Sequence, residues 1–121
     1  MRVCDAIDRV DSLKHNTYTN AEKIEWLSQL DGNIKNEIID THESDDEIFF
    51  YGYTEDYMEA ELLVEAPYDV LYIRWLEAQI DYYNGEINRY NNSMMMYQAA
   101  YDNYDRYYNR THMPKGQTLK Y

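Results

Sequence analysis

The chain has 121 residues, a formal net charge of −12, one cysteine and 15 tyrosines. Its length suits one domain with a modest core. The acidic charge disfavours direct binding to nucleic acid or to an anionic membrane surface, because basic groups must displace counterions there. A single cysteine excludes an intrachain disulfide. The first ten residues lack the apolar block of a signal peptide, and no stretch is apolar enough to cross a bilayer, so we expect a cytosolic protein.

The first forty residues carry two helical patterns. Val3, Ile7 and Val10 share one helical face, which predicts a short helix over about 2–13. Thr19 precedes Glu22 by three residues, the spacing of a capping box, so a second helix is expected over about 20–39. The apolar stripe of this helix keeps its phase across the internal Gly32, which predicts one helix with a weak point. Trp26 lies off the stripe and is expected to pack against another element.

The character of the chain changes between residues 40 and 66, where carboxylates are dense and Lys and Arg are absent. Like charges at this density disfavour compaction, so we expect a long acidic loop. Two apolar clusters, at 48–51 and at 62–64, predict the two points at which this loop touches the core.

The stretch from residue 67 to residue 110 has apolar residues that alternate in steps of three and four from Ile73 to Tyr108. This heptad pattern predicts a long helix that opens at Pro67, with Trp75 more central in the core than Trp26. Turn-forming residues at 84–85 and at 91–93 leave a hairpin open as the alternative, but the unbroken phase favours a continuous helix.

A continuous helix over 67–110 would be about 64 Å long, more than so small a domain can cover. We therefore expect its distal half to meet another subunit. Before Asn91 the pattern is equally consistent with an intrachain core, and after Asn91 the contact between subunits is favoured. The residues expected at this interface are Tyr90, Met94, Tyr97, Tyr101, Tyr104 and Tyr108.

The last eleven residues, 111–121, form an extended basic tail in which Pro114 and Gly116 oppose helix continuation. Basic residues gather in this tail and just before it, within the last sixteen positions of an otherwise acidic protein, which predicts an acidic receptor. The expected contacts to a partner or a neighbouring copy are Arg106, Arg110, Lys115, Lys120 and Tyr121. The sequence thus predicts an all-α fold: one helical domain over 1–110, a small bundle with a long C-terminal heptad-patterned helix and an acidic loop, followed by this tail.

Residue patterns typical of catalysis or of cofactor binding are missing from the sequence. The three histidines, His15, His42 and His112, fall in separate segments, so neither a di-iron nor a zinc site is indicated. Phosphate-binding, dinucleotide-binding and serine-hydrolase motifs are absent as well. The sequence therefore predicts a protein without catalytic activity, metal or cofactor.

Two parts of the chain resemble a known group of proteins when they are taken together. The first runs through 8–11, 23–27 and 30–32; the second runs through 67–69, 75–82, 84–86, 89–93, 100–101 and 108–114, and its Asn-Arg-Thr-His-Met-Pro ending is the most specific element. They resemble head–tail connector (adaptor) proteins of tailed bacteriophages and prophages of Gram-positive bacteria. The resemblance covers most of the chain except residues 41–61.

The resemblance implies a virion structural protein at the head–tail interface, assembled in the host cytoplasm. It implies a dodecameric ring beneath the phage portal protein, with a stopper or tail-completion protein below and DNA passing through without specific binding. The acidic segment is then expected to face the lumen or solvent. The same acidic character leaves one alternative open, a phage-encoded inhibitor that mimics DNA and binds a host protein. The residues assigned to the acidic segment are Asp45, Asp46, Glu47, Glu55 and Asp56.

Overall fold

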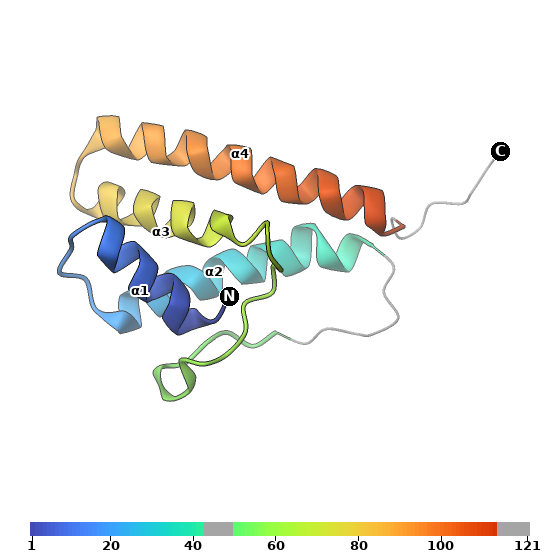
Figure 1. The fold of residues 1–121 in the computed structure, drawn as a ribbon, viewed down its shortest axis with the longest axis horizontal. Helices are drawn as coiled ribbons and strands as arrows, with labels where there is room; N and C mark the ends of the chain where they lie inside the picture. Colours follow the sequence, from blue (N-terminus) through green and yellow to red (C-terminus); the bar gives the residue numbers. More distant parts are fainter. Residues whose placement is uncertain (43–49, 114–121) are drawn as a thin grey trace.

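Four helices make up the protein in the computed structural model, which describes residues 1–42 and 50–113 (Figure 1). Two 3-10 turns, η1 (Ile39–Thr41) and η2 (Glu55–Tyr57), lie between the second and third helices. No strand occurs among these residues, so the prediction of a small all-α bundle is confirmed. The helices are α1 (Val3–Leu13), α2 (Asn20–Glu37), α3 (Val70–Tyr83) and α4 (Ile87–Thr111).

The helices α1 and α2 begin and end close to the predicted residues. The N–H of Glu22 donates to Oγ1 of Thr19 at 3.2 Å, which caps the first turn of α2 as its sequence predicts. Gly32 lies inside α2 and does not interrupt it. Trp26 packs against the end of α3, where its ring stacks on that of Tyr83 at 5.5 Å. Both the capped start and the packing of Trp26 on another element are therefore confirmed.

The continuous helix that the heptad phase favoured over 67–110 is wrong. α3 ends at Tyr83, and the chain turns back so that α4 packs along α3 (Figure 1). Gly85 has φ of 74°, and the N–H of Glu86 donates to the carbonyl of Asp81 at 3.0 Å, which is a Schellman ending. Both helices of the hairpin turn their apolar faces to one core, so heptad phase could be preserved across the turn.

Two further details of this stretch differ from its predicted form. α3 begins at Val70, with Asp69 as its N-cap residue, and not at Pro67, because residues 65–69 form turns: the N–H of Tyr68 donates to the carbonyl of Glu65 at 3.0 Å. The second turn candidate, at 91–93, lies inside an unbroken α4.

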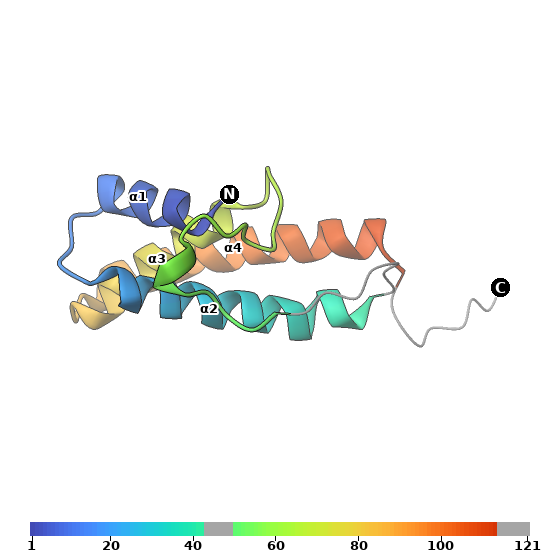
Figure 2. The same cartoon turned by 90° about the horizontal axis from the view of Figure 1, so that it is seen from below.

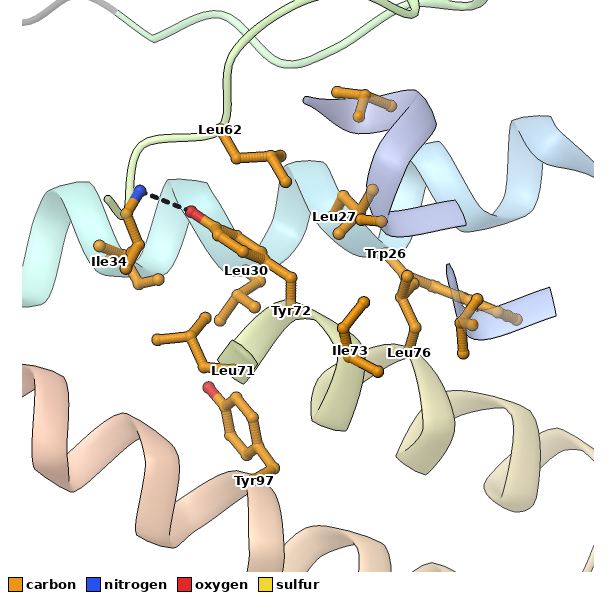
Figure 3. Packing of buried hydrophobic residues seen from close by; sticks show 14 of the residues in the cluster. Trp26, Leu27, Leu30, Ile34, Leu62, Leu71, Tyr72, Ile73, Leu76 and Tyr97 are labelled. Carbon is orange, nitrogen blue, oxygen red and sulfur yellow. Dashed lines mark hydrogen bonds between the residues drawn. The ribbon is translucent and has the colours of Figure 1, made fainter. Parts of the chain in front are cut away.

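The core lies between all four helices, and the loop covers one side of it (Figure 3). Leu27, Leu30 and Ile34 of α2 face Leu71 and Leu76 of α3. Burial of large apolar side chains of this kind contributes about 1.5–3 kcal/mol each. The core therefore fixes how α2 and α3 lie against each other, and with them the ends of the acidic loop.

The described residues confirm one of the two contacts predicted between the acidic loop and the core. Leu62 and Val64 are buried, which confirms the contact at 62–64. In the other cluster Phe50 packs on Tyr53 while Tyr51 is 91% exposed, and residues 48 and 49 lie outside the described residues. Figure 2 shows the loop crossing in front of the bundle between α2 and α1.

Backbone hydrogen bonds fasten the loop to the start of α1. The N–H of Val3 donates to the carbonyl of Ala60 at 3.0 Å, and the N–H of Cys4 donates to the carbonyl of Met58 at 2.9 Å. The first N–H groups of a helix have no partner within it, so the loop satisfies two of them. The loop is thus part of the folded unit between residues 58 and 64.

Candidate interaction surfaces

A buried carboxylate, Asp31 of α2, ties the acidic loop to the helices. It accepts hydrogen bonds from the hydroxyl of Tyr72 at 2.6 Å, from the N–H of Leu63 at 3.1 Å, and from the hydroxyl of Tyr53. The hydroxyl of Tyr72 accepts in turn from the N–H of Val64 at 2.8 Å (Figure 3). Burial raises the pKa of Asp31, and the three donors oppose this shift.

Other buried polar groups have partners within the chain. Asp81 of α3 is 1% exposed and accepts from Nζ of Lys14 and Oγ of Ser93, each at 2.6 Å, which joins α3 to the end of α1 and to α4. The buried Lys23 reaches Oδ1 of Asp11 at 2.7 Å. Among the described residues no buried side-chain nitrogen or oxygen lacks a hydrogen-bond partner. These groups serve the fold and leave no polar atom aimed at a ligand.

His42 joins the end of α2 to the end of α4. Its Nδ1 lies 2.6 Å from the carbonyl oxygen of Ile38, and its Nε2 lies 2.6 Å from Oδ1 of Asn109. The ring also packs edge-on against Tyr108 at 4.9 Å. This contact with α4 closes the far end of the bundle, and no sequence pattern predicted it.

The described part of the chain holds no group of three His, Cys, Asp or Glu side chains that could bind a metal ion. None of the four helices is long and apolar enough to span a bilayer.

The tyrosine pattern of α4, assigned to a subunit interface beyond Asn91, is largely covered by the chain itself. Tyr97, Tyr104 and Tyr108 are 8%, 1% and 7% exposed. The hydroxyl of Tyr101 donates to Oε2 of Glu37 at 2.7 Å, and burial raises the pKa of the Tyr101 hydroxyl. The cause is the hairpin, which lays α4 over α3 and α2, so the intrachain alternative describes these rings. Tyr90, Met94 and Tyr101 are half-buried.

The opposite side of α4 is exposed, and Asp102, between Ala99 and Arg106, is the exposed carboxylate on it. Met95 is 72% exposed and Met96 is 50% exposed, and Ala99 follows on the same face. Arg106 and Arg110 are exposed near the end of the helix. We call Met95, Met96, Ala99, Arg106 and Arg110 the α4 face. Sequence reasoning missed its apolar part because it assigned α4 by its tyrosines, although Met95, Ala99 and Arg106 repeat at helical spacing.

The described part of the acidic segment is exposed at η2. Glu55, Asp56 and Glu59 are exposed there, beside Tyr51 and Tyr57, which are 91% and 62% exposed. We call these five residues the acidic edge. In Figure 1 it lies at the bottom of the molecule and α4 at the top. Asp45, Asp46 and Glu47 of the predicted acidic segment lie outside the described residues, as do the predicted contact residues Lys115, Lys120 and Tyr121.

Comparison of the chain with protein-family models, with curated proteins and with solved structures gave no match. The function is therefore inferred from the surface of the molecule and from the resemblance of the quoted segments.

Proposed function

We propose that this chain is a virion structural protein, a head–tail adaptor that forms a ring beneath the phage portal protein. The observation that carries the proposal is the separation of charge on the surface. Carboxylates gather at the acidic edge, whereas the α4 face on the other side of the bundle carries Arg106 and Arg110 beside one exposed carboxylate, Asp102. A subunit of a ring needs two unlike faces, because each copy meets a different surface of its neighbour.

The net charge of −12 suits a protein through which DNA passes. Carboxylates that face a channel repel phosphate groups, so the DNA does not adhere to the wall. In this role the carboxylates that no neighbouring copy covers face the lumen or solvent. A stopper or tail-completion protein is the partner on the side away from the portal, and the ring is expected to be dodecameric.

The internal bonding of the molecule also supports a structural role over a catalytic one. The buried carboxylates Asp31 and Asp81 are each held by at least two donors, which fixes the loop and the hairpin in place. Rigid subunits lose less conformational entropy when they assemble. The proposed protein is therefore a preformed block with its interaction surface on the outside.

The proposal is tested by mixing the purified chain with the portal protein encoded in the same phage or prophage genome. We expect the two to elute together in size-exclusion chromatography, and we expect a DNA duplex added at physiological ionic strength to elute separately. A chain that ignores the portal protein but displaces DNA from a host nuclease or repressor is a DNA mimic, and that result contradicts the proposal.

A matched variant checks the role assigned to the carboxylates. Glu55→Lys with Asp56→Lys replaces two exposed negative charges with positive ones, so DNA affinity should rise steeply at low salt. A wild-type chain that already retains DNA at physiological ionic strength contradicts the repulsive role.

A further inference from the structure

We propose that copies of this chain associate head to tail, with the α4 face of one copy packed on the acidic edge of the next. The α4 face consists of Met95, Met96, Ala99, Arg106 and Arg110, and the acidic edge consists of Tyr51, Glu55, Asp56, Tyr57 and Glu59. The inference deepens the proposed function, on which it rests, by naming the two surfaces that would join neighbouring subunits.

The two surfaces match in charge. The guanidinium groups of Arg106 and Arg110 outnumber the one carboxylate exposed beside them on α4, that of Asp102. The carboxylates of Glu55, Asp56 and Glu59 are exposed on the loop, where no basic residue accompanies them. Arginine and carboxylate form short, paired hydrogen bonds when they meet. The acidic character of the remaining surface repels other approaches between copies, so charge selects this pairing over the alternatives.

The two surfaces also match in their apolar parts. Met95 and Met96 project from the middle of α4, and Tyr51 and Tyr57 are the large apolar side chains exposed on the loop. Methionine sulfur makes favourable contacts with aromatic rings, and its flexible chain adapts to the ring it meets. Protein interfaces commonly have large apolar side chains at the centre, which lose their water when the partner binds, and charged residues around them.

Internal contacts leave the side chains of the acidic edge facing outward. Tyr53 turns inward to Asp31, and Leu62 and Val64 fill the core, so the segment is fastened from beneath. Tyr51 and Tyr57, on either side of Tyr53, stay exposed. A fastened segment can present its carboxylates to a neighbour without first being ordered, which lowers the entropic cost of the contact.

The positions of the two surfaces determine the kind of assembly. They lie on opposite sides of the bundle (Figures 1 and 2), so a copy that uses its α4 face still has its acidic edge free. Such a contact between unlike faces adds copies in one direction and closes into a ring when the rotation between copies permits. A symmetric dimer would need each surface to meet itself, and carboxylates at the acidic edge would repel one another.

The experiment uses two charge-reversed variants that should fail alone and succeed together. The first carries Arg106→Glu and Arg110→Glu, and the second carries Glu55→Lys and Asp56→Lys. In either variant alone, like charges face each other in every contact, so association should weaken by more than about tenfold. In an equimolar mixture every contact between unlike variants is again a pairing of opposite charges, so association should return to the wild-type level.

Sedimentation velocity at low ionic strength measures the association of the wild type, of each variant and of the mixture. A wild type that stays monomeric up to about 1 mM overturns the proposal, because so weak a contact would not hold a ring. A mixture that behaves like the sum of its separate variants overturns it as well. Because all four positions are exposed, circular dichroism should show that both variants keep the wild-type melting temperature.

Two controls separate this contact from general charge effects and from the proposed function. Asp8→Lys with Ser12→Lys changes the charge of the exposed face of α1 and should leave association unchanged. If the wild type binds the portal protein but the mixture of the two variants does not regain wild-type association, the proposed contact is wrong and the adaptor role stands. If the mixture regains wild-type association but the wild type does not bind the portal protein, the proposed contact stands and the adaptor role is wrong.

Discussion

Asp31 is the residue on which the attachment of the loop depends most. Its carboxylate accepts from two tyrosine hydroxyls and from the backbone of Leu63, so it joins α2, α3 and the loop. Asp31→Asn keeps one acceptor oxygen but presents an amide N–H₂ to at least one donor. We expect this variant to lose about 1–3 kcal/mol for each donor left unpaired, measured by urea unfolding at neutral pH.

The pH dependence of the same variant tests whether burial dominates at Asp31. Its pKa in the folded state is raised above the ordinary value of 3.8, so the folded protein holds this proton more tightly than the unfolded chain does. The stability of the wild type relative to Asp31→Asn should then fall as the pH rises from about 4 towards neutral. A relative stability that increases with pH would mean that the hydrogen bonds outweigh burial. Asp8→Asn controls for the loss of one charge.

The structure reverses the predicted ranking of the two tryptophans, because Trp26 is more deeply buried than Trp75. Trp26 is 6% exposed and lies between Tyr18 and Tyr83, whereas Trp75 is half-buried and donates its Nε1–H to the carbonyl of Trp26 at 2.8 Å. We expect Trp26→Ala to cost about 3–5 kcal/mol and Trp75→Ala to cost less. Thermal melting of both variants measures the difference, and a larger loss for Trp75→Ala contradicts this account of the core.

At the scale of elements, local signals predicted some features and missed others. The capping residue Thr19 and the apolar periods predicted α1 and α2, because these signals act within a few residues. Heptad phase could not distinguish a continuous helix from the α3–α4 hairpin, since both keep apolar residues on one side. The hydrogen bond between Asp31 and Tyr72 joins residues that are 41 positions apart, and no local sequence pattern predicts such a pair.

Substitution of two glycines by alanine tests the α3–α4 hairpin and α2, and we expect stability changes of opposite sign. Gly85 has φ of 74°, and a Cβ added there meets nothing within 4 Å, so Gly85→Ala should lose about 1–2 kcal/mol from backbone strain alone. Gly32 lies within α2, where an added Cβ makes ordinary contact with Phe50 at 3.9 Å. Gly32→Ala should therefore stabilise the protein by about 0.5–1 kcal/mol. Equal shifts of the two melting temperatures would contradict the hairpin.

At the scale of the whole molecule, the α3–α4 hairpin decides which surface is available. Because it turns Tyr97, Tyr104 and Tyr108 inward, the α4 face of methionines and arginines is what a neighbour can meet. The sequence predicted a subunit contact on the tyrosine side of α4, which the hairpin covers. The tyrosine pattern is a stronger periodic signal than the pattern of Met95, Ala99 and Arg106. Only the fold-back of α4 reveals that the tyrosine side is covered.

The central claim is that this chain is a structural part of the virion, and its copy number in purified particles tests that claim most directly. Quantitative mass spectrometry of virions from the phage or induced prophage that encodes the chain compares its copies with those of the portal protein. A ring beneath the portal predicts that the chain is present at about the copy number of the portal subunits. A chain that is abundant in the lysate of infected cells and absent from purified particles contradicts the account.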